Sequence, residues 1–222
     1  MESETTTDRA ADPMAAAIDV FTRQGYDATT VDDLADAVEL SRSTFFRRFG
    51  SKEDVVFADH ELLLNRVESF LESSSLPPLE AVCAAGRLVF EHHVERREVS
   101  VARFALLHDV PALRDRELIT SYRYERAFTQ YLRTALPVGA DRDYVSVAFS
   151  AAAVALHNAI LRQWLFDPAA DLAPELRTQL RALTRAFSAN REQPEASRVL
   201  VTVFDPGTDR DDILDSIRAA LP

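Results

Sequence analysis

The residues best suited to chemistry lie in one short basic segment near the N-terminus. Residues 40–52 contain Arg42, Arg47, Arg48 and Lys52 and no Asp or Glu. Arginine can form paired hydrogen bonds with guanine, and serine and threonine hydroxyls can bond to bases or phosphates. The chain has a net charge of −11, so this segment, at +4, leaves −15 on the remainder. We therefore expect a local DNA-binding surface on a protein whose body repels DNA.

The other polar residues give no sign of catalysis or metal binding. The single cysteine, Cys83, excludes an intramolecular disulfide and a cysteine-based metal cluster. The adjacent His92 and His93 would face different sides of a helix, which is poor geometry for a shared metal, and no glycine-rich phosphate loop is present. The sequence predicts a non-enzymatic protein without cofactor or metal. The alternative is a helical enzyme or carrier for a hydrophobic molecule, with a vestigial DNA-binding segment.

Two short helices joined by a tight turn must position the basic segment, in the helix-turn-helix arrangement whose second helix enters the major groove. Thr30 is expected to open the first helix, with Asp33 completing a variant of the capping box. Ser41 is expected to cap the second helix. Phe45 and Phe49 lie one turn apart and would pack inward. The side chains expected to contact DNA are Thr30, Ser41, Arg42, Ser43, Thr44, Phe46, Arg47 and Lys52.

These DNA-contacting residues divide into two roles. Thr30, Ser41 and Lys52 stand at helix N-termini, where backbone N–H groups and the helix dipole favour phosphate, so they are expected to hold the DNA backbone. The others lie along the helix that follows Ser41 and are expected to face the bases. For Phe46 two roles remain open, contact with a thymine methyl group or simple packing.

Residues 14–60 resemble the TetR/AcrR family of bacterial regulators. The similarity is carried by Phe21, by Gly-Tyr-Asp-Ala-Thr-Thr-Val-Asp-Asp-Leu-Ala at 25–35 and by Ser-Arg-Ser-Thr-Phe-Phe-Arg-Arg-Phe-Gly-Ser-Lys-Glu at 41–53. The resemblance implies that residues 13–51 form a three-helix DNA-binding head. It also implies that residues 52–191 form a variable ligand-binding and dimerisation body, in which a ligand changes the spacing of two heads and releases the operator.

The chain departs from the family pattern at three positions. Glu39 and Ser43 stand where glycine is common, and Phe46 stands where tyrosine is common. An acidic residue in the turn is expected to carry backbone strain on the order of 1 kcal/mol at Glu39. Ser43 adds a hydroxyl that could contact a base, and Phe46 lacks one that could contact a phosphate.

The rest of the chain is typical of an all-α protein, because glycine is scarce and alanine, leucine and arginine are abundant. Helical patterns are expected at 13–24, 52–73, 79–96, 99–107, 111–136, 142–166 and 174–190. The stretch 144–161 is apolar and about long enough to cross a bilayer. Its alanines and interspersed polar residues favour a buried or interface helix instead, so no membrane partner is expected.

Polar and aromatic residues inside the apolar helices are candidates for an effector pocket. They are Phe104, Leu107, His108, Tyr122, Phe128, His157, Asn158 and Trp164. A buried histidine or asparagine that simply bonds to a neighbouring backbone group is the alternative explanation for this pattern. The expected effector is a small, mainly apolar molecule.

The two ends of the chain are expected to differ from the helical body. Residues 1–12 contain no apolar run and predict a disordered tail rather than a signal peptide, which fits a cytoplasmic protein. Residues 192–222 form an extension of uncertain role, with a strand predicted at 198–204 and a helix at 209–221.

Dimerisation follows from the size of one reading head. A single helix-turn-helix reads only a few base pairs, and specificity comes from two heads about 34–36 Å apart on a palindromic site. The apolar pattern at 142–166 and the amphipathic pattern at 174–190 are the expected interface. The sequence therefore predicts an all-α homodimeric regulator, acting as a repressor on operator DNA and released by a small molecule.

Overall fold

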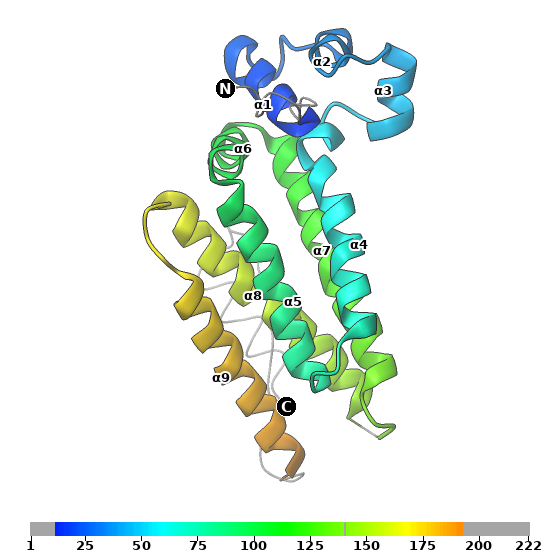
Figure 1. Ribbon diagram of the computed structural model, residues 1–222, viewed down its shortest axis with the longest axis vertical. Helices are drawn as coiled ribbons and strands as arrows, with labels where there is room; N and C mark the ends of the chain where they lie inside the picture. The colour runs from blue at the N-terminus through cyan, green and yellow to red at the C-terminus, as the bar shows by residue number, and fades with distance from the viewer. Residues whose placement is uncertain (1–11, 140, 193–222) are drawn as a thin grey trace, which may run out of the picture.

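The computed structural model describes residues 12–139 and 141–192, and within these ranges all regular structure is helical. A three-helix head lies at one end of an elongated helical body (Figure 1). The head contains α1 (Pro13–Gln24), α2 (Val31–Ala37) and α3 (Arg42–Phe49), followed by a 3-10 turn, η1 (Asp54–Phe57). The body contains α4 (Ala58–Ser73), α5 (Pro78–Glu95), α6 (Arg97–Asp109), α7 (Pro111–Ala135), α8 (Arg142–Phe166) and α9 (Ala173–Glu192).

Local sequence signals set the helix boundaries of the head. The Asp12 carboxylate accepts a hydrogen bond from the backbone N–H of Met14 at 3.1 Å and so caps α1. At α2, Thr30 and Asp33 form the predicted capping box, in which each side chain accepts from the other's backbone N–H. Ser41 caps α3 by accepting from the N–H of Thr44 at 3.3 Å. The predicted helix-turn-helix is confirmed.

The turn between α2 and α3 contains Glu39 at φ 55°, the one residue other than glycine with positive φ among the described residues. Replacing Glu39 with glycine is expected to raise the free energy of unfolding by about 1 kcal/mol, because glycine adopts this conformation without the strain that a Cβ causes. Chemical denaturation followed by circular dichroism measures the change. Asp36→Gly, placed inside α2, is the matched control and should lower stability by a similar amount. A stability loss in both variants would contradict the assignment of strain.

The predicted continuous helix over 52–73 is wrong at its start. Ser51 Oγ accepts from the N–H of Asp54 at 3.1 Å, but Asp54 begins only the short η1 turn, and the α-helix begins at Ala58. The interruption has a packing reason. Val55, Val56 and Phe57 are consecutive and all buried, because this turn lies between the head and the body and is covered on all sides.

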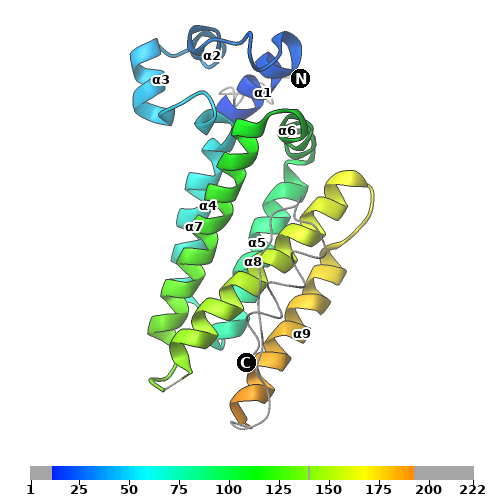
Figure 2. The ribbon, with the colours of Figure 1, turned by 180° about the vertical axis from the view of Figure 1, so that it is seen from behind.

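Two hydrophobic clusters form the interior of the protein. The body cluster is built from α4, α5, α7, α8 and α9, and it includes Trp164, which is 2% exposed. The head cluster contains the inner faces of α1, α2, α3 and η1, and it also takes in Leu107, Val110 and Leu113 from the junction of α6 and α7. This junction abuts α1 at the head end of the body (Figures 1 and 2). The head is therefore packed against the body rather than tethered to it.

Helix α8 is long and apolar enough to cross a membrane by length and composition alone, with a mean hydropathy of 1.6. Half of that apolar window is buried inside the protein, as the sequence predicted for this stretch. It crosses in front of α5 in the view of Figure 2 and packs against α7, α5 and α9. Of the disordered tail predicted at 1–12, residues 1–11 lie outside the described residues, whereas Asp12 is described and caps α1. The predicted strand at 198–204 and helix at 209–221 also lie outside the described residues.

Candidate DNA interface and effector cavity

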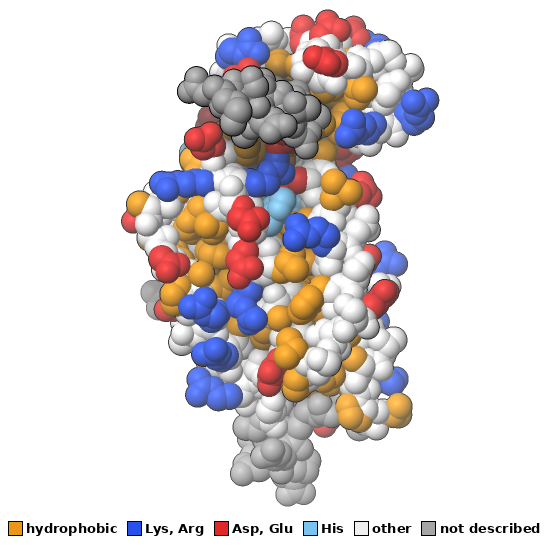
Figure 3. All heavy atoms as spheres, viewed as in Figure 1, with side chains coloured by type: hydrophobic (Ala, Val, Ile, Leu, Met, Phe, Trp, Pro, Cys, Tyr) orange, Lys and Arg blue, Asp and Glu red, His pale blue; other side chains and the backbone are white. Residues whose placement is uncertain are grey.

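Helix α3 presents one buried and one exposed face. Phe45 is fully buried and its ring lies 5.0 Å from that of the partly buried Phe49. The exposed residues of α3 are Arg42, Ser43, Phe46, Arg47 and Arg48, and Thr44 is partly buried. The basic side chains of α3 form one edge of the head, beside acidic side chains that lie over α2 (Figure 3). Of the residues that the sequence predicted to face the bases, Arg42, Ser43, Phe46 and Arg47 are exposed, whereas Thr44 is exposed only in part.

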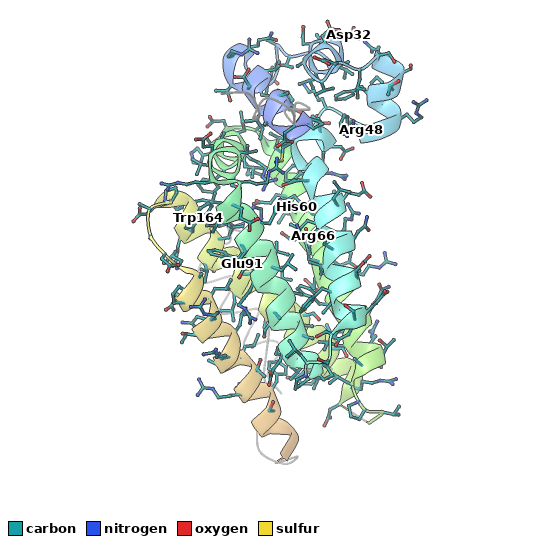
Figure 4. The ribbon with its side chains drawn as sticks, in the orientation of Figure 1. Asp32, Arg48, His60, Arg66, Glu91 and Trp164 are labelled. Atoms are coloured by element: carbon teal, nitrogen blue, oxygen red, sulfur yellow. The ribbon has the colours of Figure 1, made fainter. Side chains whose placement is uncertain are left out.

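Arg42 has a carboxylate partner that the sequence did not predict. Its guanidinium donates to Asp32 of α2 at 2.8 Å and lies 5.6 Å above the ring of Phe46. The two charged side chains of the pair are 60% and 62% exposed. Exposed pairs of this kind contribute little to stability, so a phosphate or a base edge can replace Asp32 at small cost. Asp32 lies at the end of the protein farthest from α9 (Figure 4).

The hydroxyl groups expected to anchor phosphate take part in helix caps. Ser41 Oγ donates to Thr44 Oγ1 at 2.9 Å and lies 3.1 Å from Ser43 Oγ. Thr30 Oγ1 donates to Asp33 at 2.6 Å. Thr30 and Ser41 are both exposed, so their helix N-termini remain open to an anion although their hydroxyls already have partners.

Lys52 lies differently from the other basic residues. Its ammonium donates to the backbone carbonyl of Tyr26 at 3.1 Å and lies 3.9 Å from the centre of the Tyr26 ring. The Tyr26 hydroxyl donates in turn to Glu53, and burial raises the pKa of Tyr26 above its ordinary value. Lys52 and Glu53 therefore hold the loop between α1 and α2 from two sides. Lys52 therefore connects two segments of the head through its contacts with Tyr26, and it does not lie on the exposed face of α3.

The body contains a cavity next to the head, bounded by α4, α5, α6, α7 and α8. Apolar side chains form most of its surface, and they include Phe57, Val89, Phe104, Leu107, Phe128, Val154, Leu161 and Leu165. Polar side chains from α4, α5, α6, α7 and α8 also line the cavity. They are His60, His93, Ser100, Arg103, Glu117, Thr120, Ser121, Tyr124, His157 and Asn158. Figure 4 shows His60 near the first turn of α4, between α4 and α5.

Five of the eight predicted pocket residues line this cavity: Phe104, Leu107, Phe128, His157 and Asn158. The other three do not. His108 is exposed, and Tyr122, 62% exposed, lies on the outside of α7. Trp164 is buried in the body cluster, where its ring packs 6.1 Å from that of Phe90.

Arg103 of α6 is the most buried charged residue at the cavity, at 4% exposure. Its guanidinium donates to Asp59 at 3.1 Å and to His93 Nδ1 at 3.1 Å, and it lies 3.3 Å from the Met14 sulfur of α1. The carboxylate of Asp59 is shared by two further donors, His92 Nε2 at 3.0 Å and the Arg96 guanidinium at 3.3 Å. Three donors therefore surround one buried carboxylate at the border between the head and the body.

The charge of Asp59 is stabilised by these partners. Burial by itself would raise the pKa of this carboxyl, but the hydrogen bond from His92 and the positive charge of Arg103 hold the pKa well below its ordinary value. Arg96 carries the connection further, because it also forms an ion pair with Asp12, the N-cap of α1. A continuous polar chain therefore runs from the cavity wall to the first helix of the head.

Three histidines of the cavity are neutral at neutral pH. Burial lowers the pKa of His60 to about 3 and that of His157 to about 4, and it lowers the pKa of His93 well below the ordinary value. Their hydrogen bonds fix two of the tautomers. His157 Nδ1 must donate to the Gly86 carbonyl at 3.1 Å, and His93 Nδ1 must accept from Arg103, since a guanidinium only donates.

Both the head and the body of this chain resemble those of known regulators. The family model described as "Bacterial regulatory proteins, tetR family" matches residues 14–58, and the model described as "MftR C-terminal domain" matches residues 76–188. Over 166 residues the chain is 29% identical to the HTH-type transcriptional regulator TcmR of Streptomyces glaucescens, covering 70% of this chain and 73% of TcmR.

Solved structures share the fold at lower identity. The transcriptional regulator FadR of Bacillus subtilis, in complex with stearoyl-CoA, matches with a TM-score of 0.52 and 17% identity, over 78% of this chain and 96% of FadR. The fatty acid degradation regulator FadR of Bacillus halodurans matches with a TM-score of 0.54 and 15% identity, over 81% of this chain and 96% of that protein.

Proposed function

We propose that this chain, which belongs to the TetR family of bacterial transcriptional regulators, is a homodimeric repressor of the cytoplasm that binds a palindromic operator and is released by a small molecule. The family is not one of enzymes, which removes the enzyme alternative raised by the sequence. The finer parts of the proposal, namely the dimer, the operator and the effector, rest on the geometry of the head and the cavity.

The exposed face of α3 is the observation that carries the proposal. Ser43 and Arg47 lie opposite the buried Phe45, with Arg42 and Phe46 beside them, and all four are exposed. Helix α3 buries a phenylalanine on one face and exposes arginine and serine on the opposite face. Such a helix fits the major groove, where the exposed side chains can form hydrogen bonds with base edges. The acidic remainder of the chain keeps other surfaces away from DNA.

Helix α8 offers a surface for a second copy of the chain. Val147 and Phe166 are 45% and 78% exposed, and Ala155 and Ala159 are exposed between them. Small side chains on this face allow a second helix to approach closely, and burial of the larger ones favours association. The exposed arginines of α9 lie along one edge of the body and are expected to remain outside the interface (Figure 3). They are Arg177, Arg181 and Arg185.

The test selects an operator from random duplex DNA with the full-length protein and then compares two variants. Arg47→Ala is expected to weaken operator binding by about 1–3 kcal/mol and to relax specificity at one base pair, because a base contact is lost. Fluorescence anisotropy against a set of single-base operator variants measures both effects. The selected sites should show dyad symmetry, and analytical ultracentrifugation should give two chains per site.

Arg48→Ala is the matched control on the same helix. Its guanidinium lies 5.2 Å from the centre of the Phe49 ring, so the substitution removes the same charge at an exposed residue that is not one of the four side chains proposed to read bases. It should weaken binding to all DNA sequences alike. Equal effects of the two variants on specificity, or selection of no common sequence by the wild-type protein, would overturn the proposal.

A further inference from the structure

We propose that the effector cavity takes an amphipathic carboxylate, whose anionic group replaces Asp59 on Arg103 while its apolar part lies among the apolar side chains of α5, α7 and α8. The proposal rests on the proposed function, because it names the ligand class of that cavity. It also names the connection between the cavity and the head. That connection is the chain of ion pairs from Arg103 through Asp59 and Arg96 to Asp12.

The geometry of Arg103 is the first step. Its guanidinium lines the cavity, is 4% exposed and already binds one carboxylate, that of Asp59. A planar guanidinium matches the two oxygens of a carboxylate, and the match is stronger where water is excluded. The neighbouring histidines, His60, His93 and His157, are neutral, so Arg103 is the positive group that the described cavity wall offers to an anion. The wall also contains one carboxylate, that of Glu117, which lies 3.9 Å from the guanidinium of Arg162.

The second step is that Asp59 can lose Arg103 without becoming unpaired. It keeps the hydrogen bond from His92 at 3.0 Å and the ion pair with Arg96 at 3.3 Å. A buried carboxylate with a single partner could not exchange it, since an unpaired buried charge costs several kcal/mol. One anion therefore replaces another at Arg103, and the number of charges in contact with it does not change.

The third step carries the exchange to the head. Arg96 is shared between Asp59 and Asp12, and Asp12 caps α1. When Asp59 loses Arg103, its remaining cationic partner is Arg96, which is drawn away from Asp12. Arg103 itself leaves the Met14 sulfur of α1. Both changes loosen α1, which packs against α2 and so supports α3.

Decanoate is the probe for the ligand class, with decanol and decylamine of equal chain length as controls. Isothermal titration calorimetry with the full-length protein should show decanoate binding more tightly than decanol and no binding of decylamine. Arg103→Gln should weaken decanoate binding by about ten- to a hundredfold, because a charge-assisted hydrogen bond is lost. Equal affinity for decanoate and decanol would overturn the proposal.

The variant Asp59→Asn provides a second test of the ligand class, which remains available if Arg103→Gln does not fold. It preserves the size of the side chain and removes the anion that competes for Arg103, so decanoate should bind more tightly than to the wild-type protein. A purely structural role of the Asp59–Arg103 pair predicts the opposite, because loss of the pair would loosen the cavity. Weaker decanoate binding in Asp59→Asn would therefore contradict the exchange.

The connection to the head is tested by operator release. Decanoate should lower the operator affinity of the wild-type protein by about tenfold, within the usual range of allosteric coupling. Asp12→Asn, which can still cap α1, should reduce this factor, because the last ion pair of the chain is gone. Asp19→Asn is the matched control, since this exposed carboxylate of α1 pairs with Arg23 and lies outside the chain of ion pairs.

The two proposals fail in different ways. If the wild-type protein binds no operator, the proposed function is wrong. If it binds an operator that decanoate does not release, or if Asp12→Asn and Asp19→Asn change the release equally, the proposed function stands and the present inference is wrong.

Discussion

Replacing Phe45 with alanine is expected to lower the free energy of unfolding by about 3–5 kcal/mol, a large effect for a single substitution in the head. Phe45 is fully buried, and its ring contacts those of Phe46 and Phe49 in the centre of the head cluster. Removing it leaves a cavity that the short helices α2 and α3 cannot close. Urea denaturation followed by circular dichroism measures the loss, since the head contributes three helices to the signal.

Phe46→Ala is the matched control for this experiment. Phe46 is the next residue along α3 and is 42% exposed, so the same change in side-chain size should cost much less stability. Trp164, the single tryptophan, lies in the body cluster, and its fluorescence reports separately on the body. Similar destabilisation by the two substitutions would show that α3 does not bury Phe45 as described.

The second large effect is a loss of stability in mild acid. The pKa values of His60 and His157 in the folded protein are about 3 and about 4, and that of His93 is also lowered, whereas an unfolded histidine has its ordinary pKa near 6.5. Below pH 6.5 the unfolded chain therefore binds protons that the folded chain does not, and the free energy of unfolding falls as the pH falls. Each histidine contributes roughly 1 kcal/mol per pH unit, so three together approach the whole stability of an ordinary domain by about pH 4.

Urea denaturation at a fixed protein concentration, repeated between pH 7 and pH 4, tests this expectation. His157→Gln should reduce the slope of stability against pH by about a third, because one of the three groups no longer titrates. His108→Gln removes an exposed histidine outside the cavity and is the matched control. Asp59 acts in a different pH range. Because its pKa is lowered in the folded protein, it contributes stability at any pH above the ordinary pKa of an aspartate, and this contribution is lost only as the pH falls below that value. A stability that stays flat down to pH 4 would contradict the neutral, buried state of the three histidines.

Local signals in the sequence were sufficient to predict the head. Caps at Thr30 and Ser41, glycines after α1 and α3, and phenylalanines one turn apart are all short-range features, and they fix the helix boundaries. The resemblance to the TetR family is confirmed. The η1 turn was missed because its cause is not local: residues 55–57 are buried only once the head lies on the body.

The cavity was harder to predict, because its residues come from five helices whose relative rotation the sequence does not state. Tyr124 lies one turn before Phe128 and shares its face, so periodicity could have selected it in place of Tyr122. Arg103 lies one turn before the buried Leu107. A charged residue on the apolar face of a helix was the sequence feature that could have identified it as a cavity residue. The pairing of Arg103 with Asp59 joins residues 44 positions apart, which no local pattern reveals.

The insertion of Leu107, Val110 and Leu113 into the head cluster limits how this protein can be recombined with its relatives. A chimaera that joins the head of one regulator to the body of another at η1 would keep α1 but replace the three side chains on which α1 rests. Such a hybrid is expected to bind the operator of the head's parent with reduced affinity, because the head would pack against body residues that do not fit it. Carrying these three residues along with the transplanted head should restore the fit, which makes them part of the head although they lie about fifty residues beyond it.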